Sequence, residues 1–485
     1  MKIGKVGIFA GGVVIGLLLG CAFGCLKWKS QKLVVREPAV PGESRLEYTP
    51  PPEPKFSAEF MVKYLPLLLD MITPRVVKVT ADIYVAMGYA MGNVTMVITD
   101  EGLVIIDTTE SEDAARRIFK DFRKITDQPV RYIIYTHFHP DHNQGTRAFY
   151  SEGVQILATG EFLHWIHGRN PDLGNRHFQR SLDLLGGAVE PDYAFSLPFR
   201  SPFLAAGQTP EVMMPTLTFD QEYTFTLAGK LFDLFHTRGE TEDHLAVWIP
   251  DERALQVGDL YYASFPNLTG ILLEARPVQG WMESLTRFIE LQPDYLILGH
   301  TRHLKGADLI QERLRNYREA IQYVYDETVR SIAEGKPVHQ AVAEIKLPDH
   351  LANLPYLQGL YGRVDWSIRG IYQDYTGWYD GWGTKLFPLP PQYPAREIAA
   401  LAGGADKILA RAIELQKNDE HQLAAELCDI VIAANPRDKL AHTVKAHSMQ
   451  YLAMSATNAL AIGAYRSAYA LHLKAAAGAA LGQEF

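Results

Sequence analysis

Cysteine is scarce in this sequence, and long blocks of charge of one sign are absent. Among 485 residues there are three cysteines, two of which, Cys21 and Cys25, lie close together near the N-terminus. Neither a disulfide framework nor a four-cysteine zinc site can be built from so few. The 47 lysines and arginines stand against 56 acidic residues, a net charge of −9. Without a basic block, this balance argues against nucleic acid as a partner.

Long hydrophobic runs are also rare, with one exception at the N-terminus. No charged residue interrupts residues 6–26, a stretch long enough to cross the core of a bilayer. Lys2 and Lys5 precede it, and the segment LLGC that ends at Cys21 is similar to a lipoprotein signal-peptidase site. An uncleaved anchor, a lipoprotein modified on Cys21 and a cleaved export signal all stay open, as does the orientation. We expect a membrane-associated protein in the periplasm or another extracytoplasmic space.

The remainder has the composition of a folded protein with more than one domain. Hydrophobic residues make up 47% and charged residues 21%, and the chain is too long for one ordinary core. Six prolines among few apolar residues in 37–55 predict an extended spacer. Beyond residue 300 the apolar spacing becomes helical, first in 307–335 and then in the alanine-rich stretches of 403–475.

Strands and a helix alternate in the region between the spacer and residue 300. The segments VVKVTADIYVAM, NVTMVITDEGLVIIDTT and VRYIIYTH have the pattern of strands, and SEDAARRIFKDFRKI that of an amphipathic helix. A second series of strands occupies 217–300, and polar residues follow the apolar strands in both series. This pattern predicts a layered α/β architecture with functional residues at the strand ends.

The densest chemical signal is the segment THFHPDHNQG, which directly follows the strand RYIIY. It contains three histidines and an aspartate within six positions: His137, His139, Asp141 and His142. Imidazole and carboxylate are ordinary zinc ligands, so metal binding explains this density better than a structural role does. On an extended backbone His137 and His139 point the same way, while Asp141 and His142 follow the turn and can face a second ion. The segment therefore predicts a centre for two metal ions.

The same segment resembles the signature of the metallo-β-lactamase superfamily, and further motifs of that superfamily follow in order. Asp107 in LVIIDTT resembles its first aspartate, Asp259 in VGDLYY its bridging aspartate, and His300 in ILGHT its last histidine. The resemblance implies an α/β fold, namely an αββα sandwich. It also implies two divalent metal ions, expected to be Zn²⁺.

Two features narrow the resemblance to the alkylsulfatase branch. Glu240 stands where the superfamily usually has a histidine, and the branch also has a glutamate there. The segment RGIYQDYTGWYDGWGTKLFPLPP closely resembles a signature of the branch, and the helical region after it resembles the branch's dimerisation domain. We therefore expect a homodimer. The expected domains are an anchor or signal segment (1–27), a spacer and lead-in (28–74), a metallo-β-lactamase-like catalytic domain (75–320), a helical extension with the GWYDG segment (321–400) and an all-helical dimerisation domain (401–485).

Roles for individual residues follow from the resemblance. Seven side chains are implied as metal ligands: His137, His139 and Glu240 for one ion, Asp141, His142 and His300 for the other, and Asp259 between them. Asp141 is also the candidate catalytic residue. Asp107 is expected to support the histidine segment through hydrogen bonds rather than to take part in catalysis. Metal-bound hydroxide would act as nucleophile or general base.

The chain departs from the branch where substrate is expected to bind. The branch has an Asn-Leu-Tyr-Thr-Leu-Arg-Gly phrase with a sulfate-facing arginine, whereas this chain has NLTGILL from Asn267 to Leu273. Arg276 is a candidate substitute, although a lone arginine is more often a surface residue. Tyr379 in GWYDG is a second candidate for substrate contact, with core packing as the alternative. The branch's C-terminal sterol-carrier-like domain has no room before Phe485, which puts long alkyl sulfates in doubt.

These observations predict a binuclear metal-dependent hydrolase of alkyl sulfate esters or related small esters. The missing arginine favours, as an alternative within hydrolases, a member that acts on a carboxylic ester, lactone, thioester or phosphoester. A mononuclear-iron oxidoreductase is a rival that the ligand set with Asp141 and His300 disfavours, and a tethered interaction protein is a third possibility. Expected partners are a small ester, a membrane and a second copy of the chain, and no nucleic acid.

Overall fold

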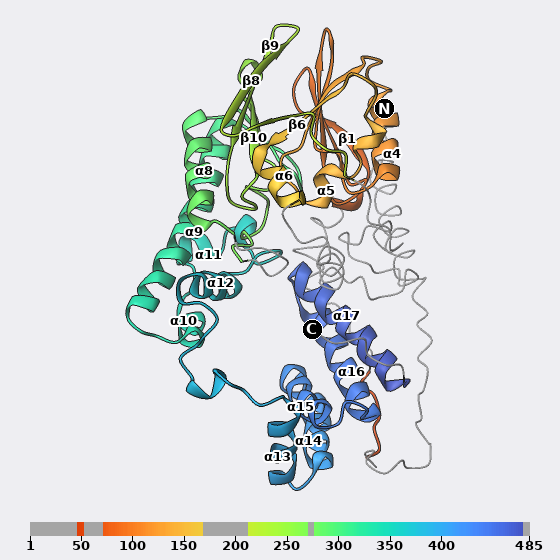
Figure 1. The fold of residues 1–485 in the computed structure, drawn as a ribbon, viewed down its shortest axis with the longest axis vertical. Coiled ribbons are helices and arrows are strands. Elements are labelled where there is room, and N and C mark those ends of the chain that lie inside the picture. The colour runs from red at the N-terminus through yellow and green to blue at the C-terminus, as the bar shows by residue number, and fades with distance from the viewer. Residues whose placement is uncertain (1–45, 53–70, 168–211, 270–275, 479–485) are drawn as a thin grey trace, which may run out of the picture.

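The computed structural model describes residues 46–52, 71–167, 212–269 and 276–478. The predicted anchor or signal segment, with Cys21, lies outside the described residues, as does most of the predicted spacer. Figure 1 shows two β-sheets packed together at one end of the molecule and a group of helices at the other. Within the described ranges, no helix combines the length and the apolar character needed to cross a bilayer.

Within the described part of the chain, the first sheet has seven strands in chain order. They are β1 (Arg75–Lys78), β2 (Ile83–Met87), β3 (Val94–Thr99), β4 (Gly102–Ile106), β5 (Val130–Ile134), β6 (Gln155–Thr159) and β7 (Leu217–Phe219). The first four strands pair antiparallel, and β4 to β7 pair in parallel. All five residues of β4 are buried, as expected for a central strand covered on both faces.

The second sheet has six strands in the order β13-β12-β11-β10-β9-β8. They are β8 (Glu222–Leu227), β9 (Lys230–His236), β10 (Leu245–Ile249), β11 (Ala254–Gln256), β12 (Tyr295–Ile297) and β13 (Leu304–Lys305). Among the described strands of this sheet, β11 and β12 pair in parallel and the other neighbours pair antiparallel.

Helices cover the outer faces of the two sheets. Helices α4 (Glu112–Phe122) and α6 (Gly160–His167) lie on the first sheet, and α8 (Val278–Leu291) and α9 (Ala307–Ala333) lie on the second. The short helix α5 (Pro140–Asn143) lies at the end of the first sheet. One apolar core fills the space between the sheets, and two others join each sheet to its helices. The order helix, sheet, sheet, helix confirms the predicted αββα sandwich.

Helix α4 illustrates how local sequence sets an element. The Ser111 side chain caps the helix by accepting a hydrogen bond of 3.3 Å from the Ala114 N–H. Glu112 and Asp113 place negative charge in the first turn, where it interacts favourably with the helix dipole. Ile118 and Phe122, four residues apart, are both buried against the sheet.

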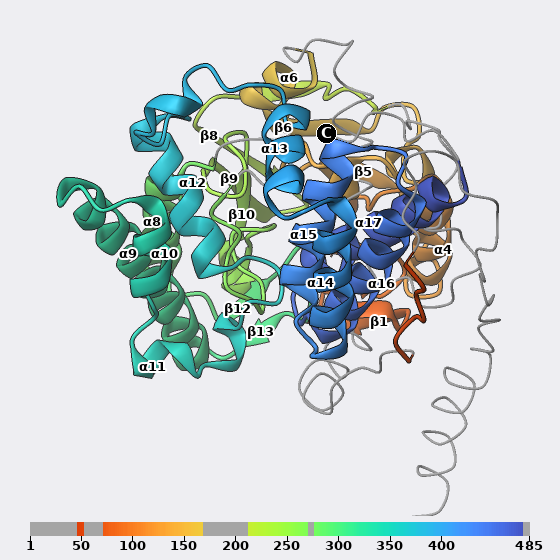
Figure 2. The same ribbon diagram turned by 90° about the horizontal axis from the view of Figure 1, so that it is seen from below.

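The C-terminal half is helical, as predicted. Helices α10 (Val338–Glu344), α11 (Asp349–Ala352) and α12 (Val364–Thr376) pack with α9, and an exposed segment then leads to α13 (Gln392–Leu401), α14 (Ala405–Lys417), α15 (His421–Ala434), α16 (Lys439–Ser455) and α17 (Ala459–Ala476). Figure 2 shows these last five helices side by side, next to the group formed by α8 to α12. Asn458 joins the two groups because its amide donates to the Gly359 and Tyr361 carbonyls at 3.0 and 2.7 Å.

Candidate metal centre

The predicted ligands follow strands that end at the same edge of each sheet. In the first sheet β4 and β5 pair in parallel, so Asp107 and His137, which come shortly after them, emerge together. In the second sheet the parallel strands β11 and β12 are followed by Asp259 and His300. The Gly299 N–H donates to the Gly258 carbonyl at 2.8 Å and holds the last two loops against each other.

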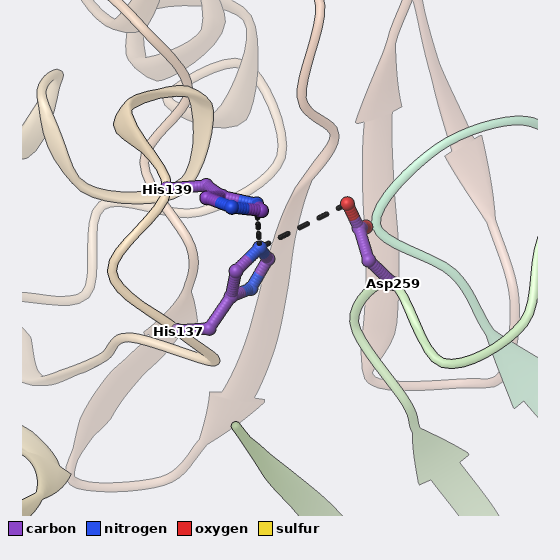
Figure 3. A group of neighbouring side chains, drawn as sticks. All are labelled: His137, His139 and Asp259. Atoms are coloured by element: carbon purple, nitrogen blue, oxygen red, sulfur yellow. Dashed lines mark hydrogen bonds and ion pairs between the residues drawn. The ribbon is translucent and has the colours of Figure 1, made fainter. Parts of the chain in front are cut away.

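One candidate group of metal-binding side chains consists of His137, His139 and Asp259, whose potential ligand atoms all lie within 4.8 Å of one another. His137 Nε2 is 2.9 Å from His139 Nδ1 and 3.9 Å from Asp259 Oδ2. Figure 3 shows the two imidazoles on one loop and the carboxylate on the opposite loop, pointing toward one another. Burial holds the pKa of His137 well below its ordinary value, so this ring is neutral and able to bind a cation.

A second group consists of Asp141, His142 and His300. Asp141 Oδ2 is 3.5 Å from His142 Nε2 and 3.3 Å from His300 Nε2. Asp259 Oδ2 also reaches this group, at 3.4 Å from His142 Nε2 and 3.0 Å from His300 Nε2. The Asp259 carboxylate is therefore shared by both groups.

The charges of the second group shift one another's pKa. Burial alone would raise the pKa of Asp141, but His142 and His300 lower it to about 2. Burial alone would lower the pKa of His300, but Asp259 and Asp141 raise it to about 9. Without an ion, protons on the imidazoles balance the carboxylates, and a divalent cation can take the place of those protons.

Asp107 supports the histidine segment in the predicted way. Its Oδ1 accepts from the Thr136 N–H at 2.8 Å, and its Oδ2 accepts from the Thr136 hydroxyl at 2.9 Å and lies 2.8 Å from His142 Nδ1. Asp107 is fully buried, and burial raises its pKa. It has no atom in either group of metal-binding side chains, and it fixes the ring of His142 so that Nε2 faces the second group.

Glu240 lies beside the first group but outside it. Its buried carboxylate forms an ion pair with Arg276, in which both side chains are 1% exposed. Burial raises the pKa of Glu240 while the Arg276 guanidinium opposes the rise, and the charges of Asp259 and His139 also act on it. The expectation that a lone arginine lies at the surface is wrong for Arg276, because pairing with Glu240 makes its burial possible.

Two polar residues that the sequence analysis missed hold His300 in place. His300 Nδ1 lies 3.0 Å from the Met91 carbonyl, and the Glu110 carboxylate accepts from the Met91 N–H at 2.9 Å. The Asn93 amide donates to the carbonyls of Leu298 and Thr301 at 3.1 and 2.8 Å, on either side of His300. No motif marks Glu110 or Asn93, because both act through main-chain atoms of distant segments.

Tyr379 is not brought to this site among the described residues. It lies between α12 and α13, where the centre of its ring is 6.0 Å from that of Trp378. Trp378 itself is 72% exposed. The role of Tyr379 in substrate contact stays a prediction.

The residues present fit a divalent metal ion. His142 Nε2 and Asp259 Oδ1 are buried without a hydrogen-bond partner among the described residues, which is costly unless another ligand satisfies them. Both atoms belong to side chains that bind zinc in proteins, and His142 Nε2 faces the carboxylates of Asp141 and Asp259 at 3.5 and 3.4 Å. The six side chains of the two groups therefore form a candidate metal centre.

Comparisons with known proteins match this architecture. Residues 87–300 match the model of the metallo-β-lactamase superfamily, and residues 338–474 match the model for alkyl sulfatase dimerisation. A linear primary-alkylsulfatase of Pseudomonas sp. is 35% identical over 75% of this chain and 70% of its own length. An alkyl/aryl-sulfatase of Saccharomyces cerevisiae is 26% identical over 80% of this chain, which spans 63% of that relative.

Solved structures share the fold. The structure of a double mutant of a sec-alkyl sulfatase superposes with a TM-score of 0.77 at 22% identity, covering 90% of this chain and 74% of that one. A stereoselective inverting sec-alkylsulfatase from Pseudomonas sp. gives a TM-score of 0.74 at 22% identity, covering 84% of this chain and 66% of that one. At this level of identity the similarity establishes the fold and leaves the substrate open.

Proposed function

The chain belongs to the alkylsulfatase family of the metallo-β-lactamase superfamily, a family of hydrolases, and we propose that it is a binuclear metal-dependent hydrolase of alkyl sulfate esters or related small esters. The observation that carries the proposal is the position of Asp259. Its Oδ2 lies 3.9 Å from His137 Nε2 in one group and 3.0 Å from His300 Nε2 in the other. A carboxylate shared in this way suits two neighbouring cations.

Two bound divalent ions, which we expect to be Zn²⁺, would supply an activated water and polarise an ester oxygen. His137 and His139 would hold one ion and Asp141, His142 and His300 the other, with Asp259 between them. Glu240 remains a proposed ligand of the first ion. A pKa of about 2 keeps the proposed catalytic residue Asp141 ionised at neutral pH, so it accepts hydrogen bonds and orients a partner but has no proton to donate.

The proposed preference for an anionic ester rests on the charge beside the two groups. Arg276 places a buried guanidinium next to Glu240, and guanidinium is well suited to sulfate oxygens because it offers several donors in a plane. Arg276 therefore remains our proposed sulfate contact. Tyr379, which the sequence alone suggests, remains a proposed substrate contact. The alternative, a carboxylic ester, lactone, thioester or phosphoester, is favoured by the absence of the branch's arginine phrase at 267–273.

The test compares substrates that share one alkyl chain. Purified full-length protein loaded with Zn²⁺ is offered octyl sulfate, octyl phosphate and an octanoate ester, and release of sulfate, phosphate or acid is measured. We expect octyl sulfate to be the best substrate and two ions to be bound per chain. Faster turnover of the phosphate or the carboxylic ester would contradict the sulfatase proposal, and one ion at saturation would contradict the binuclear one.

The matched variants of this test replace one histidine each. His139→Ala removes a ligand of the first group, so we expect turnover to fall to the background rate. His350→Ala removes an exposed histidine that contacts Glu319 on the surface, and we expect unchanged turnover. Equal rates for His139→Ala and the unsubstituted protein would refute the assignment of the metal centre.

We also propose a homodimer and a membrane tether. The homodimer is supported by the match of residues 338–474 to the dimerisation model. The tether, with an extracytoplasmic location, is supported by the apolar run at 6–26 alone. Fractionation of cells that express the full chain or a chain without residues 1–27 tests the second proposal, because only the full chain should be recovered with membranes.

A further inference from the structure

His244 occupies a fully buried position between the loops that carry the two groups of metal-binding side chains. It immediately precedes β10, and its side chain is 0% exposed. Its Nδ1 lies 3.0 Å from the Thr237 hydroxyl, and its Nε2 lies 3.2 Å from the main-chain N of Asp259. The imidazole therefore contacts the backbone of the shared carboxylate directly.

These two contacts fix the form of the ring. A main-chain N–H can only donate, so His244 Nε2 accepts from Asp259 and carries no proton. The proton of the neutral ring is then on Nδ1, from which it is donated to the Thr237 hydroxyl. The ring therefore accepts a hydrogen bond from Asp259 and donates one to Thr237, and so links two loops.

The same ring also packs against the histidine segment. It stacks on His137, with ring centres 4.9 Å apart and planes inclined by 22°. A Cβ on Gly258 would lie 2.5 Å from His244 Nε2 and 3.0 Å from the Thr136 Cβ, so no side chain fits between them. One imidazole therefore touches both the residue before Asp259 and the first histidine of the motif.

We propose that His244 is a positioning residue that sets the Asp259 carboxylate between the two groups of metal-binding side chains. The inference rests on the proposed function, in which Asp259 is shared by two ions. Asp259 Oδ2 lies between 3.0 and 3.9 Å from the Nε2 atoms of His300, His142 and His137. A small shift of the Asp259 main chain would therefore move this oxygen closer to one group and farther from the other. Groups that orient metal ligands in this way contribute about 10- to 100-fold to metal affinity.

Two substitutions separate the hydrogen bond from the packing. His244→Gln keeps an acceptor at the reach of Nε2 but loses the ring, whereas His244→Phe keeps a ring of similar size but loses the acceptor. The control is His472→Phe, which makes the same chemical change at a buried histidine of α17, in the helical domain. Zn²⁺ affinity by chelator competition, the urea midpoint of metal-free protein and hydrogen exchange at the Asp259 amide are measured for each.

For His244→Phe we expect Zn²⁺ to bind at least about tenfold more weakly and the Asp259 amide of metal-free protein to exchange faster. His244→Gln should retain affinity within about threefold of the unsubstituted protein, and His472→Phe should lower the urea midpoint without changing affinity. Unchanged Zn²⁺ affinity and exchange in His244→Phe would overturn the proposal. So would equal losses in both His244 variants that simply follow their loss of stability.

The exchange measurement uses neither an ion nor a substrate, so it is independent of the proposed function. If the unsubstituted protein fails to cleave any sulfate ester, the proposed function is wrong, while faster exchange in His244→Phe alone still supports the positioning role. If exchange is unchanged, the positioning role is wrong whatever the substrate.

Discussion

The ion pair of Glu240 and Arg276 concentrates two opposite charges in a part of the site that water hardly reaches. Both side chains are 1% exposed, so neither charge is screened by solvent. Each partner makes the burial of the other tolerable, and removing one leaves an uncompensated buried charge. A substitution of one partner should therefore lower the free energy of unfolding much more than a matched substitution of both.

Arg276→Gln should lower the free energy of unfolding of the metal-free protein by about 3–5 kcal/mol, because Glu240 then stays buried without its partner. The double variant Glu240→Gln with Arg276→Gln should recover most of that loss, since no charge remains. Urea denaturation of the metal-free proteins measures both. Additive losses in the double variant would mean that the two side chains are not coupled.

The types of the candidate ligands are easier to predict from the sequence than the contacts that surround them. Six of the seven proposed ligands lie in the two groups, because the histidine segment and the motifs around Asp259 and His300 place them at strand ends. Glu240 was proposed from the same resemblance, and its pairing with Arg276 could not be read from the chain. Glu110 was missed because a glutamate that binds a distant main-chain N–H leaves no spacing pattern.

Between β2 and β3, a loop connects the two halves of the second group. Its Met91 carbonyl lies 3.0 Å from His300 Nδ1, and its Gly92 packs against the Asp141 main chain. A Cβ on Gly92 would lie 2.0 Å from the Asp141 carbonyl oxygen, so any side chain must push the loop and helix α5 apart. The loop therefore sets the distance between Asp141 and His300.

We expect Gly92→Ala to lower kcat/KM by about 100-fold, because displacements of about 1 Å in a catalytic site have effects of this size. The matched control is Gly383→Ala, since nothing lies within 4 Å of a Cβ at that position. Steady-state kinetics and the number of ions bound per chain provide the measurements. Wild-type kinetics in Gly92→Ala would show that this contact does not control the site.

Helices α16 and α17 are joined by a buried pair of histidines. His442 Nε2 lies 3.1 Å from the Pro436 carbonyl, to which it donates, so its Nδ1 accepts from His472 Nδ1 at 2.8 Å. Burial, with smaller effects from Lys445 and His442, lowers the pKa of His472 to about 3 from its ordinary 6.5. The neutral ring is thus the form that the folded helices require.

The helical domain should therefore lose stability in acid. Between pH 6.5 and pH 3 the unfolded chain binds a proton at His472 that the folded chain does not, so the free energy of unfolding falls as pH falls. The contribution of His472 to the free energy of unfolding is fully present above pH 6.5, and below that pH it decreases by at most about 1.4 kcal/mol per pH unit. Urea midpoints at pH 5, 6 and 7.5 test this, and His472→Phe should flatten the dependence.

Across the whole molecule, exposed apolar side chains gather on one segment. Of the fifteen large hydrophobic residues that are exposed among the described ones, nine lie between residues 375 and 401. Phe387 is 92% exposed, Leu401 88% and Trp378 72%. An exposed apolar stretch of this kind is typical of protein interfaces, and it falls within the region that matches the dimerisation model.

The combined substitution of Phe387 and Leu389 by serine should weaken the proposed homodimer by at least about tenfold in Kd, a change of about 1.4 kcal/mol. The control is Leu423→Ser, which alters an exposed leucine of α15, outside this segment. Sedimentation velocity over a range of concentrations measures the dissociation. A dimer that is equally stable in all three proteins would place the interface elsewhere.

The sequence by itself predicted the αββα sandwich through its family resemblance, the helical C-terminal half through its apolar spacing, and six side chains that the structure brings together in the candidate metal centre. Apolar spacing and short motifs are local properties of the chain, so they can be recognised without a structure. Only the tertiary structure decided that Asp259 Oδ2 lies 3.0 to 3.9 Å from three imidazoles, that Arg276 is buried against Glu240 and that His244 contacts the Asp259 main chain. Each of these depends on distances between loops from different strands, and such distances are set by how the two sheets pack.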